Sequence, residues 1–179
     1  MRIFEIEQEA MSPPWSYESF EEELSRNDSF FIVATGSTIE PSPCIIASSN
    51  TTEPSPCVVS TSSTTEPLPC VVDYAEPSHC VPRVCGYAII RQVGDDGELL
   101  KIAVDKTARG NGIGDLLMEA VLDHTEENGF KAVFLEVRVG NITATRLYEK
   151  HGFKSVRIRK DYYDKPFEDA IVMVRGDMW

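Results

Sequence analysis

The chain has 179 residues, of which 42% are hydrophobic and 26% charged, as expected for a single globular domain and not for a wholly disordered chain. No apolar run approaches the ~18 residues that a membrane helix needs. The net charge of −12 argues against a general nucleic-acid binder. Because the N-terminus is rich in glutamate and does not resemble a signal peptide, we expect a soluble, cytoplasmic protein.

The acidic residues are concentrated in the front half. Residues 1–36 carry eight acids and two bases, and residues 37–82 carry five acids and no base. Residues 83–179 are nearly balanced, with sixteen acids and fifteen bases. The balanced half can tolerate an anionic ligand, and the acidic front can attract a basic partner. A surface whose acids only keep the protein soluble would have the same composition.

Outside residues 37–82, the hydrophobic periodicity predicts helices and strands in a regular order. In chain order they are a helix ended by Ser12–Pro14, a helix capped by Ser16, strands at 30–34, 83–93 and 99–104, a helix at 112–128, a strand at 131–137, a helix from 141 to 152, and strands near 153–160 and 169–175. This order predicts a single domain over residues 1–179, with a central mixed α/β sheet flanked by helices.

Residues 37–82 form a low-complexity stretch that differs from the rest. They hold eight of the eleven prolines and four of the five cysteines. A unit that begins at Thr38 returns at Thr51 and again at Thr64. Its paired prolines favour extended backbone, and three such short units cannot bury a core of their own. We therefore predict a mobile insert without regular secondary structure.

The cysteines do not predict a metal site. Three of them recur with the repeat, at Cys44, Cys57 and Cys70, so the repeat itself explains their spacing. His79, Cys80 and Cys85 are compatible with a metal, but their spacing is loose and no second pair follows. We expect no bound metal and reduced thiols.

A glycine-rich turn between a strand and a helix is the most informative motif. Within Val104–Leu116, Arg109 is followed by Gly110, Gly112 and Gly114. Such a turn directs backbone N–H groups and a helix N-terminus toward one point, which predicts an anion site. A Walker loop would end in Gly-Lys-Ser/Thr, and a dinucleotide fingerprint would have glycine at Asp115. Neither pattern fits.

The turn resembles the Arg/Gln-x-x-Gly-x-Gly/Ala signature of the GNAT acyltransferases. Four further segments resemble the RimI-like branch, which acetylates the N-terminal alanine of a ribosomal protein: Pro14–Ser16, Leu135–Arg138, Leu147–Phe153 and Arg157–Tyr163. The resemblance covers residues 1–36 and 84–175 and implies the GNAT fold. RimI-like chains usually begin with a strand before the first helix. This chain begins in the helix, so we expect the first strand to be missing, which leaves a sheet edge uncovered that can pair with another segment, be shielded or be unstable. The insert falls where the family has a short hairpin turn between antiparallel strands.

The resemblance implies acetyl transfer from acetyl-CoA to a protein α-amine. Glu136 would be the base, directly or through water, and Tyr148 the acid that protonates the leaving thiolate. The CoA contacts implied are the strand Ile102, Ala103 and Val104 for the pantetheine arm, and Arg109, Gly110, Asn111, Gly112, Ile113 and Gly114 for the pyrophosphate. Asn141 would bind the CoA arm, although a simple helix cap explains it equally well. Trp15, Tyr162 and Tyr163 would line the acceptor groove.

We therefore expect an N-terminal acetyltransferase whose partner is a protein or peptide N-terminus, with a basic ribosomal protein as the fitting class. We expect no direct nucleic-acid or membrane partner. Two alternatives remain open. One is a GNAT enzyme that acts on a lysine side chain or a small amine, and the other is a CoA-binding module without activity.

Overall fold

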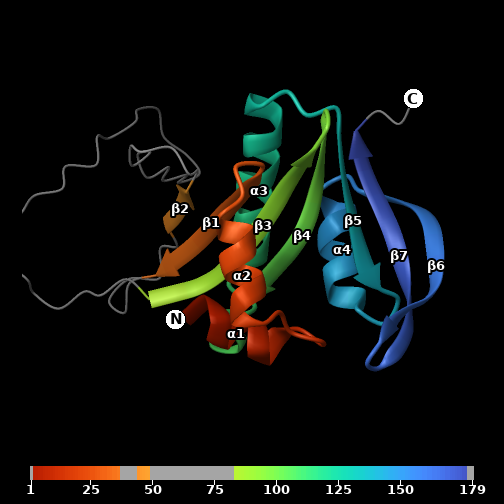
Figure 1. The fold of residues 1–179 in the computed structure, drawn as a ribbon, viewed down its shortest axis with the longest axis horizontal. Coiled ribbons are helices and arrows are strands. Elements are labelled where there is room, and N and C mark those ends of the chain that lie inside the picture. Colours follow the sequence, from red (N-terminus) through yellow and green to blue (C-terminus); the bar gives the residue numbers. More distant parts are fainter. Residues whose placement is uncertain (1, 37–43, 49–82, 177–179) are drawn as a thin grey trace, which may run out of the picture.

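The computed structural model describes residues 2–36, 44–48 and 83–176. Its elements are α1 (Arg2–Ala10), α2 (Tyr17–Leu24), β1 (Ser29–Gly36), β2 (Cys44–Ser48), β3 (Arg83–Val93), β4 (Asp96–Val104), a short 3-10 helix (Lys106–Ala108), α3 (Ile113–Glu127), β5 (Ala132–Arg138), α4 (Ile142–Lys150), β6 (Lys154–Asp164) and β7 (Phe167–Gly176). The predicted order of helices and strands is confirmed (Figure 1). The final two strands are longer than expected, so Tyr162 and Tyr163 lie inside β6.

The seven strands of the described residues form one sheet in the order β2-β1-β3-β4-β5-β7-β6. Only β4 and β5 are parallel, and every other neighbouring pair is antiparallel. The predicted mixed α/β architecture is therefore confirmed. The antiparallel pairing of β1 with β3 also confirms that the insert joins two antiparallel strands.

Strand β2 corrects the prediction that the whole insert lacks regular structure. Its residues, Cys44–Ser48, pair antiparallel with β1 from Phe31↔Ser48 to Thr35↔Cys44. The edge of β1 that we expected to be uncovered therefore carries a strand. A free edge exposes unpaired N–H and C=O groups, and a neighbouring segment with β-branched residues can satisfy them. The rest of the insert, with His79 and Cys80, lies outside the described residues, and its mobility stays a prediction.

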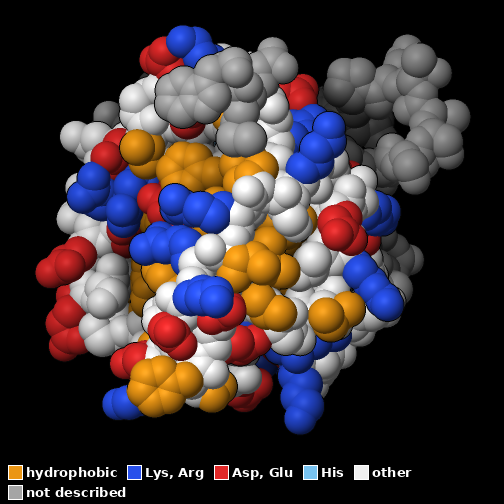
Figure 2. Space-filling model, turned by 90° about the vertical axis from the view of Figure 1, so that its right-hand side faces the viewer, with side chains coloured by type: hydrophobic (Ala, Val, Ile, Leu, Met, Phe, Trp, Pro, Cys, Tyr) orange, Lys and Arg blue, Asp and Glu red, His pale blue; other side chains and the backbone are white. Residues whose placement is uncertain are grey.

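The helices lie on both faces of the sheet, with α1 and α2 on one face and α3 and α4 on the other (Figure 1). Strand residues alternate between faces, and neighbours such as Ile89 and Ile90 belong to different core clusters. One cluster lies under α1 and α2 and comprises Ile6, Phe20, Phe31, Tyr87, Ile89 and Ala103. The other includes Leu117, Met118, Val121 and Tyr148 from α3 and α4. Strand β6 is exposed along almost its whole length, and Figure 2 shows hydrophobic and basic side chains interspersed on this side of the molecule.

Strands β4 and β5 separate after a short paired stretch. They pair only from Gly97↔Val133 to Leu99↔Leu135, although β4 continues to Val104 and β5 to Arg138. Opposite β3, Ile90 pairs with Leu99 and Ile89 with Lys101, so Leu100 is an extra residue in β4. Such a bulge bends its strand. The wedge between the two strands is visible in Figure 1.

None of the helices in the described ranges is both long and apolar enough to cross a membrane.

Candidate functional site

A cleft of about 570 Å³ lies at the wedge between β4 and β5. The α1–α2 loop forms one wall, and the end of β6 forms another. The predicted site residues that line it are Trp15, Ile102, Glu136, Asn141, Tyr148, Tyr162 and Tyr163. The other predicted residues do not line it: Ala103 and Val104 continue along β4 from Ile102, and residues 109–114 form the turn that follows.

Glu136 faces the cleft from β5, with 21% of its side chain exposed. The Arg159 guanidinium of β6 donates to its Oε1. A hydrogen bond to Glu136 raises the pKa of Tyr162 to about 12. Only the neutral phenol can donate this bond to the carboxylate, so the bond stabilises the protonated form of Tyr162. Tyr163 Oη donates to the Glu136 carbonyl at 3.5 Å. The carboxylate is therefore held in place by groups from β6.

Tyr148 reaches the cleft from α4 and is 6% exposed. Its ring lies 6.0 Å from the ring of Phe153. Burial raises the pKa of Tyr148 above its usual value, and the nearby Tyr163 adds to the effect. The hydroxyl consequently keeps its proton at neutral pH.

The acceptor-side walls are aromatic. The rings of Tyr162 and Tyr163 meet edge to face at 4.9 Å on one side. On the other side, the Lys101 ammonium lies 4.9 Å from the centre of the Trp15 ring. An aromatic face attracts a cation, and cationic side chains of the protein already lie over these rings: Lys101 over Trp15, Arg159 over Tyr162 and Arg138 over Tyr163.

A buried carboxylate holds Trp15 against the sheet. Glu7 of α1 is fully buried and accepts from the Trp15 backbone N–H at 2.8 Å and from Lys101 Nζ at 3.0 Å. Tyr87 Oη donates to the same carboxylate. Burial raises the pKa of Tyr87, and the charge and hydrogen bond of Glu7 raise it further. A buried charge that is paired and hydrogen-bonded in this way fixes the loop that it touches.

The glycine-rich turn has the conformation that an anion site requires. Gly110 and Gly112 have φ values of 80° and 76°, in the left-handed region that glycine adopts without strain. Gly112 is the N-cap of α3 and offers no side-chain cap, so the N–H groups of the first turn are not capped by it. Arg109 Nε donates to the Val104 carbonyl at 3.1 Å, which folds this side chain back along the turn. These groups give the turn a positive electrostatic character.

Asp105 anchors the start of this turn. It is 1% exposed and accepts from the Thr107 backbone N–H at 2.8 Å and from Arg83 at 3.0 Å. Arg2 of α1 donates to it as well. Burial alone would raise its pKa, but these hydrogen bonds outweigh burial and hold the pKa of Asp105 well below its usual value.

Helix α4 joins the turn to the cleft. At the first turn of α3, Asp115 accepts from Lys150 Nζ at 2.6 Å and lies 3.0 Å from His151 Nε2. At the opposite end of α4, Asn141 Oδ1 accepts from the Ala144 N–H at 3.2 Å. Asn141 therefore caps the helix and also lines the cleft, so the structure is compatible with both roles considered from the sequence.

Thirteen of the residues that line the cleft were not predicted as site residues, and four of these thirteen are charged. The four charged residues are Glu98, Lys101, Arg138 and Asp164. Glu98 lies on β4, and burial raises its pKa, with Glu136 adding to the effect. The bulge at Leu100 interrupts the alternation of inward and outward side chains in β4. The sequence pattern therefore does not indicate that Glu98 and Lys101 face the cleft. Arg138 ends the Leu135–Arg138 motif, but its partners come from distant loops.

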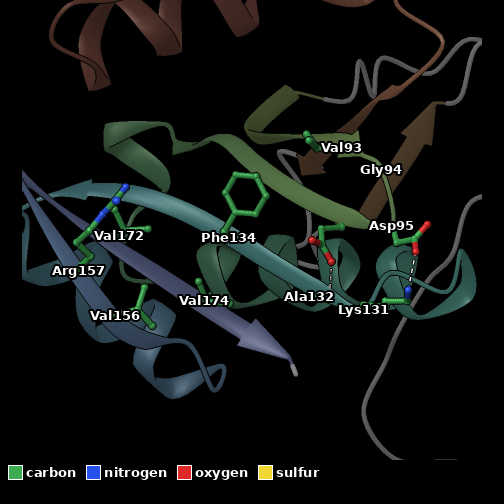
Figure 3. Close-up of a pocket in the computed structure, with 11 residues that line it drawn as sticks. Val93, Gly94, Asp95, Lys131, Ala132, Phe134, Val156, Arg157, Val172 and Val174 are labelled. Carbon is green, nitrogen blue, oxygen red and sulfur yellow. Dashed lines mark hydrogen bonds and ion pairs between the residues drawn. The ribbon is translucent and has the colours of Figure 1, made fainter. Parts of the chain in front are cut away.

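A larger hollow, of about 1190 Å³, lies on the open face of β5, β7 and β6 (Figure 3). Phe134, Val172 and Val174 are among its apolar lining residues. At its rim, Asp95 accepts from Lys131 Nζ at 2.6 Å. Because none of the predicted site residues lines this hollow, the smaller cleft is the better candidate for acetyl transfer.

Among the described residues, no group of three or more His, Cys, Asp or Glu side chains is placed to hold a metal ion. Cys85 is a half-buried free thiol.

Comparisons with known proteins point to one family. The chain is 44% identical over 91 residues to a ribosomal protein bS18-alanine N-acetyltransferase of Haemophilus influenzae, a match that spans 49% of this chain and 62% of that relative. It is 40% identical over 89 residues to the Escherichia coli K12 protein of the same name, covering 49% of this chain and 60% of that one. The matched segment thus spans about half of this chain and less than two thirds of these relatives.

The structural comparison agrees. The crystal structure of the ribosomal-protein-S18-alanine N-acetyltransferase from Escherichia coli superposes with a TM-score of 0.64 at 25% identity, covering 98% of this chain and 87% of that one. The acetyltransferase (GNAT) family matches residues 1–153, which is most of the chain. The wedge between β4 and β5 and the glycine-rich turn are thus parts of a known fold, and this chain belongs to the GNAT acetyltransferase family.

Proposed function

We propose that this protein transfers the acetyl group of acetyl-CoA to the N-terminal amine of a protein, with an alanine-starting ribosomal protein as the acceptor class. The observation that carries the proposal is the convergence of Glu136 and Tyr148 on one cleft at the wedge between β4 and β5. The names of the relatives, which act on ribosomal protein bS18 alanine, support this acceptor class.

Acetyl-CoA enters as the co-substrate. The edge of β4 that includes Ile102–Val104 is not paired with β5, because the two strands pair no further than Leu99, and Ile102 lines the cleft. The pantetheine arm pairs with this open edge, and a backbone N–H there polarises the thioester carbonyl. The pyrophosphate binds the N–H groups of residues 109–114 at the N-terminus of α3.

The acceptor amine loses its proton before it attacks. An α-amine has a pKa of about 8, so most of it arrives as an ammonium at neutral pH. Glu136 takes the proton, directly or through a water molecule. The free amine then attacks the carbonyl carbon, and the C–S bond of the resulting tetrahedral intermediate breaks. Tyr148 gives its proton to the leaving thiolate, and the resulting tyrosinate takes the proton that the new amide nitrogen loses, which restores Tyr148.

The walls of the cleft select the acceptor. Trp15 and the pair Tyr162 and Tyr163 bound a slot that suits an extended chain end. The strongly acidic front of the chain favours a basic partner such as a ribosomal protein. Such an acceptor implies a cytoplasmic enzyme that contacts neither membrane nor nucleic acid directly.

Mass spectrometry of peptides incubated with acetyl-CoA tests the proposal. Peptides that start with Ala, Ser or Met are compared with N-terminally blocked peptides whose only amine is a lysine. We expect the alanine-starting peptide to be acetylated at its α-amine and the blocked peptide to remain unmodified.

Two other outcomes would replace the proposal. Acetylation of the blocked peptide would indicate a lysine acetyltransferase. Binding of acetyl-CoA without CoA release over the whole panel would indicate an inactive CoA-binding module.

A further inference from the structure

Arg138 joins three segments that are distant in the sequence. It lies at the end of β5 with 17% of its side chain exposed. Its Nη1 donates to the Pro166 carbonyl at 3.0 Å and to Glu168 Oε2 at 3.1 Å. Its Nη2 donates to the Lys165 carbonyl at 3.0 Å and also to the Ser12 carbonyl. One guanidinium therefore binds β5, the α1–α2 loop and the β6–β7 turn together.

The segments that Arg138 joins carry the two aromatic walls of the acceptor slot. Ser12 belongs to the α1–α2 loop, which carries Trp15. Lys165 and Pro166 form the turn that directly follows Tyr162–Asp164 of β6. The walls also touch directly, since Ser12 Oγ donates to the Lys165 carbonyl at 2.9 Å.

The same guanidinium fixes an aromatic residue of the slot. Its central carbon lies 3.9 Å from the ring centre of Tyr163. Glu168 in turn accepts from the Gly140 backbone N–H at 2.5 Å, so the partner of Arg138 is itself held. Only a planar fork with several donors can satisfy three carbonyls and a carboxylate at once. A lysine would keep the charge but lose this geometry.

We propose that Arg138 is a positioning residue that holds the two walls of the acceptor slot at a fixed separation and thereby sets the affinity for the acceptor N-terminus. The effect on acceptor affinity rests on the proposed function. The clamp, by which we mean the contacts that Arg138 makes with both walls, does not. Arg138 makes no proton transfer in the reaction, and the CoA contacts proposed at residues 102–104 and 109–114 lie on other elements. Its loss should therefore change the acceptor KM far more than kcat or the binding of acetyl-CoA.

Two variants test the clamp, with a matched control. Arg138→Lys removes the fork, and Ser12→Ala removes only the direct side-chain contact between the walls. Arg175→Lys is the control, because Arg175 pairs with exposed Glu126 at 3.2 Å away from the cleft. For each variant, thermal melting checks the fold, and steady-state kinetics use an alanine-starting peptide and acetyl-CoA. Amide hydrogen exchange is followed over residues 11–16 and 164–168.

For Arg138→Lys we expect the acceptor KM to rise about tenfold or more, with kcat within about threefold and the acetyl-CoA KM within about twofold. Exchange in both loops should accelerate about tenfold. Ser12→Ala should shift the same quantities in the same direction by less, and Arg175→Lys should shift neither.

Three results would overturn or limit the inference. Unchanged exchange in both loops would show that Arg138 does not hold the walls. Faster exchange with an unchanged acceptor KM, or a fall in kcat with an unchanged KM, would show that the clamp does not set acceptor affinity. Failure of the unsubstituted protein to acetylate any peptide would refute the proposed function and the effect on acceptor affinity, whereas the exchange measurement would still decide whether the clamp exists.

Discussion

Glu98 and Glu136 face the same cleft from the two strands that separate, β4 and β5. Burial raises the pKa of the Glu98 carboxyl, and the charge of Glu136 raises it further. The two carboxylates therefore repel each other across the wedge, while the cations Lys101 and Arg138 line the same cleft. The two glutamates are therefore tested by different measurements: Glu136 by turnover and Glu98 by the pH dependence of stability.

Glu136→Gln tests the base. Because glutamine cannot take a proton from the acceptor ammonium, we expect turnover of an alanine-starting peptide to fall by ~10²-fold or more. The affinity for acetyl-CoA, measured by calorimetric titration, should stay within about twofold. Glu126→Gln on the exposed surface of α3 is the matched control and should keep full turnover. Unchanged turnover in Glu136→Gln would remove this residue from the mechanism.

Glu98→Gln tests the electrostatics through stability. The raised pKa means that the folded state holds the Glu98 proton more tightly than the unfolded state does. Ionisation therefore destabilises the fold at neutral pH, whereas below the ordinary glutamate pKa of about 4.3 both states are protonated and the penalty vanishes. We expect the variant to be more stable than the unsubstituted protein at pH 7, by about 1 kcal/mol or less.

Urea unfolding over a pH series measures this difference, which should fall toward zero as the pH approaches about 4. A variant that is less stable at pH 7, or a difference that does not depend on pH, would contradict the assignment of a raised pKa to Glu98.

Tyr148→Phe tests the acid. The substitution keeps the ring that packs beside Phe153 and removes only the hydroxyl proton. We expect turnover to fall about tenfold or more, while the free energy of unfolding changes by less than about 1 kcal/mol. The loss should shrink with an acetyl thioester of a more acidic thiol, because such a thiolate leaves without being protonated. An equal loss with both donors would argue against Tyr148 as the acid.

The sequence predicted the elements that bury a periodic apolar face. Helix α3, for example, repeats apolar residues along one side, and its predicted span differs from the observed one by a single residue at each end. Strand β2 was missed because its residues lie inside a proline-rich repeat, and its pairing depends on the free edge of β1. The length of β6 was underestimated because nearly all its residues are exposed, so no alternation of apolar and polar residues marks it.

Some residues of the candidate site could be predicted from the sequence, and others could not. The resemblance to the GNAT family supplied Glu136, Tyr148 and the glycine-rich turn, and the structure brings the first two to one cleft. The role of Arg138 was not predictable, because its partners come from segments more than twenty residues away in either direction along the chain. Such contacts depend on how the loops approach one another in the fold.

Gly112→Ala tests the turn as an anion site, with Gly129→Ala as its matched control. Both glycines have left-handed backbone, with φ values of 76° and 69°, and both have open space where a Cβ would stand. Alanine is strained at such φ values, so each variant should lose about 1–2 kcal/mol of stability in urea unfolding. Only Gly112 lies at the N-terminus of α3, whereas Gly129 follows its C-terminus.

We therefore expect Gly112→Ala to weaken coenzyme A binding about tenfold in a calorimetric titration, because the N–H groups that hold the pyrophosphate would shift. Gly129→Ala should bind coenzyme A as the unsubstituted protein does. Equal binding by both variants would show that the turn does not hold the pyrophosphate. Equal weakening of both would show that the loss comes from general destabilisation, since the two substitutions impose the same backbone strain at opposite ends of one helix.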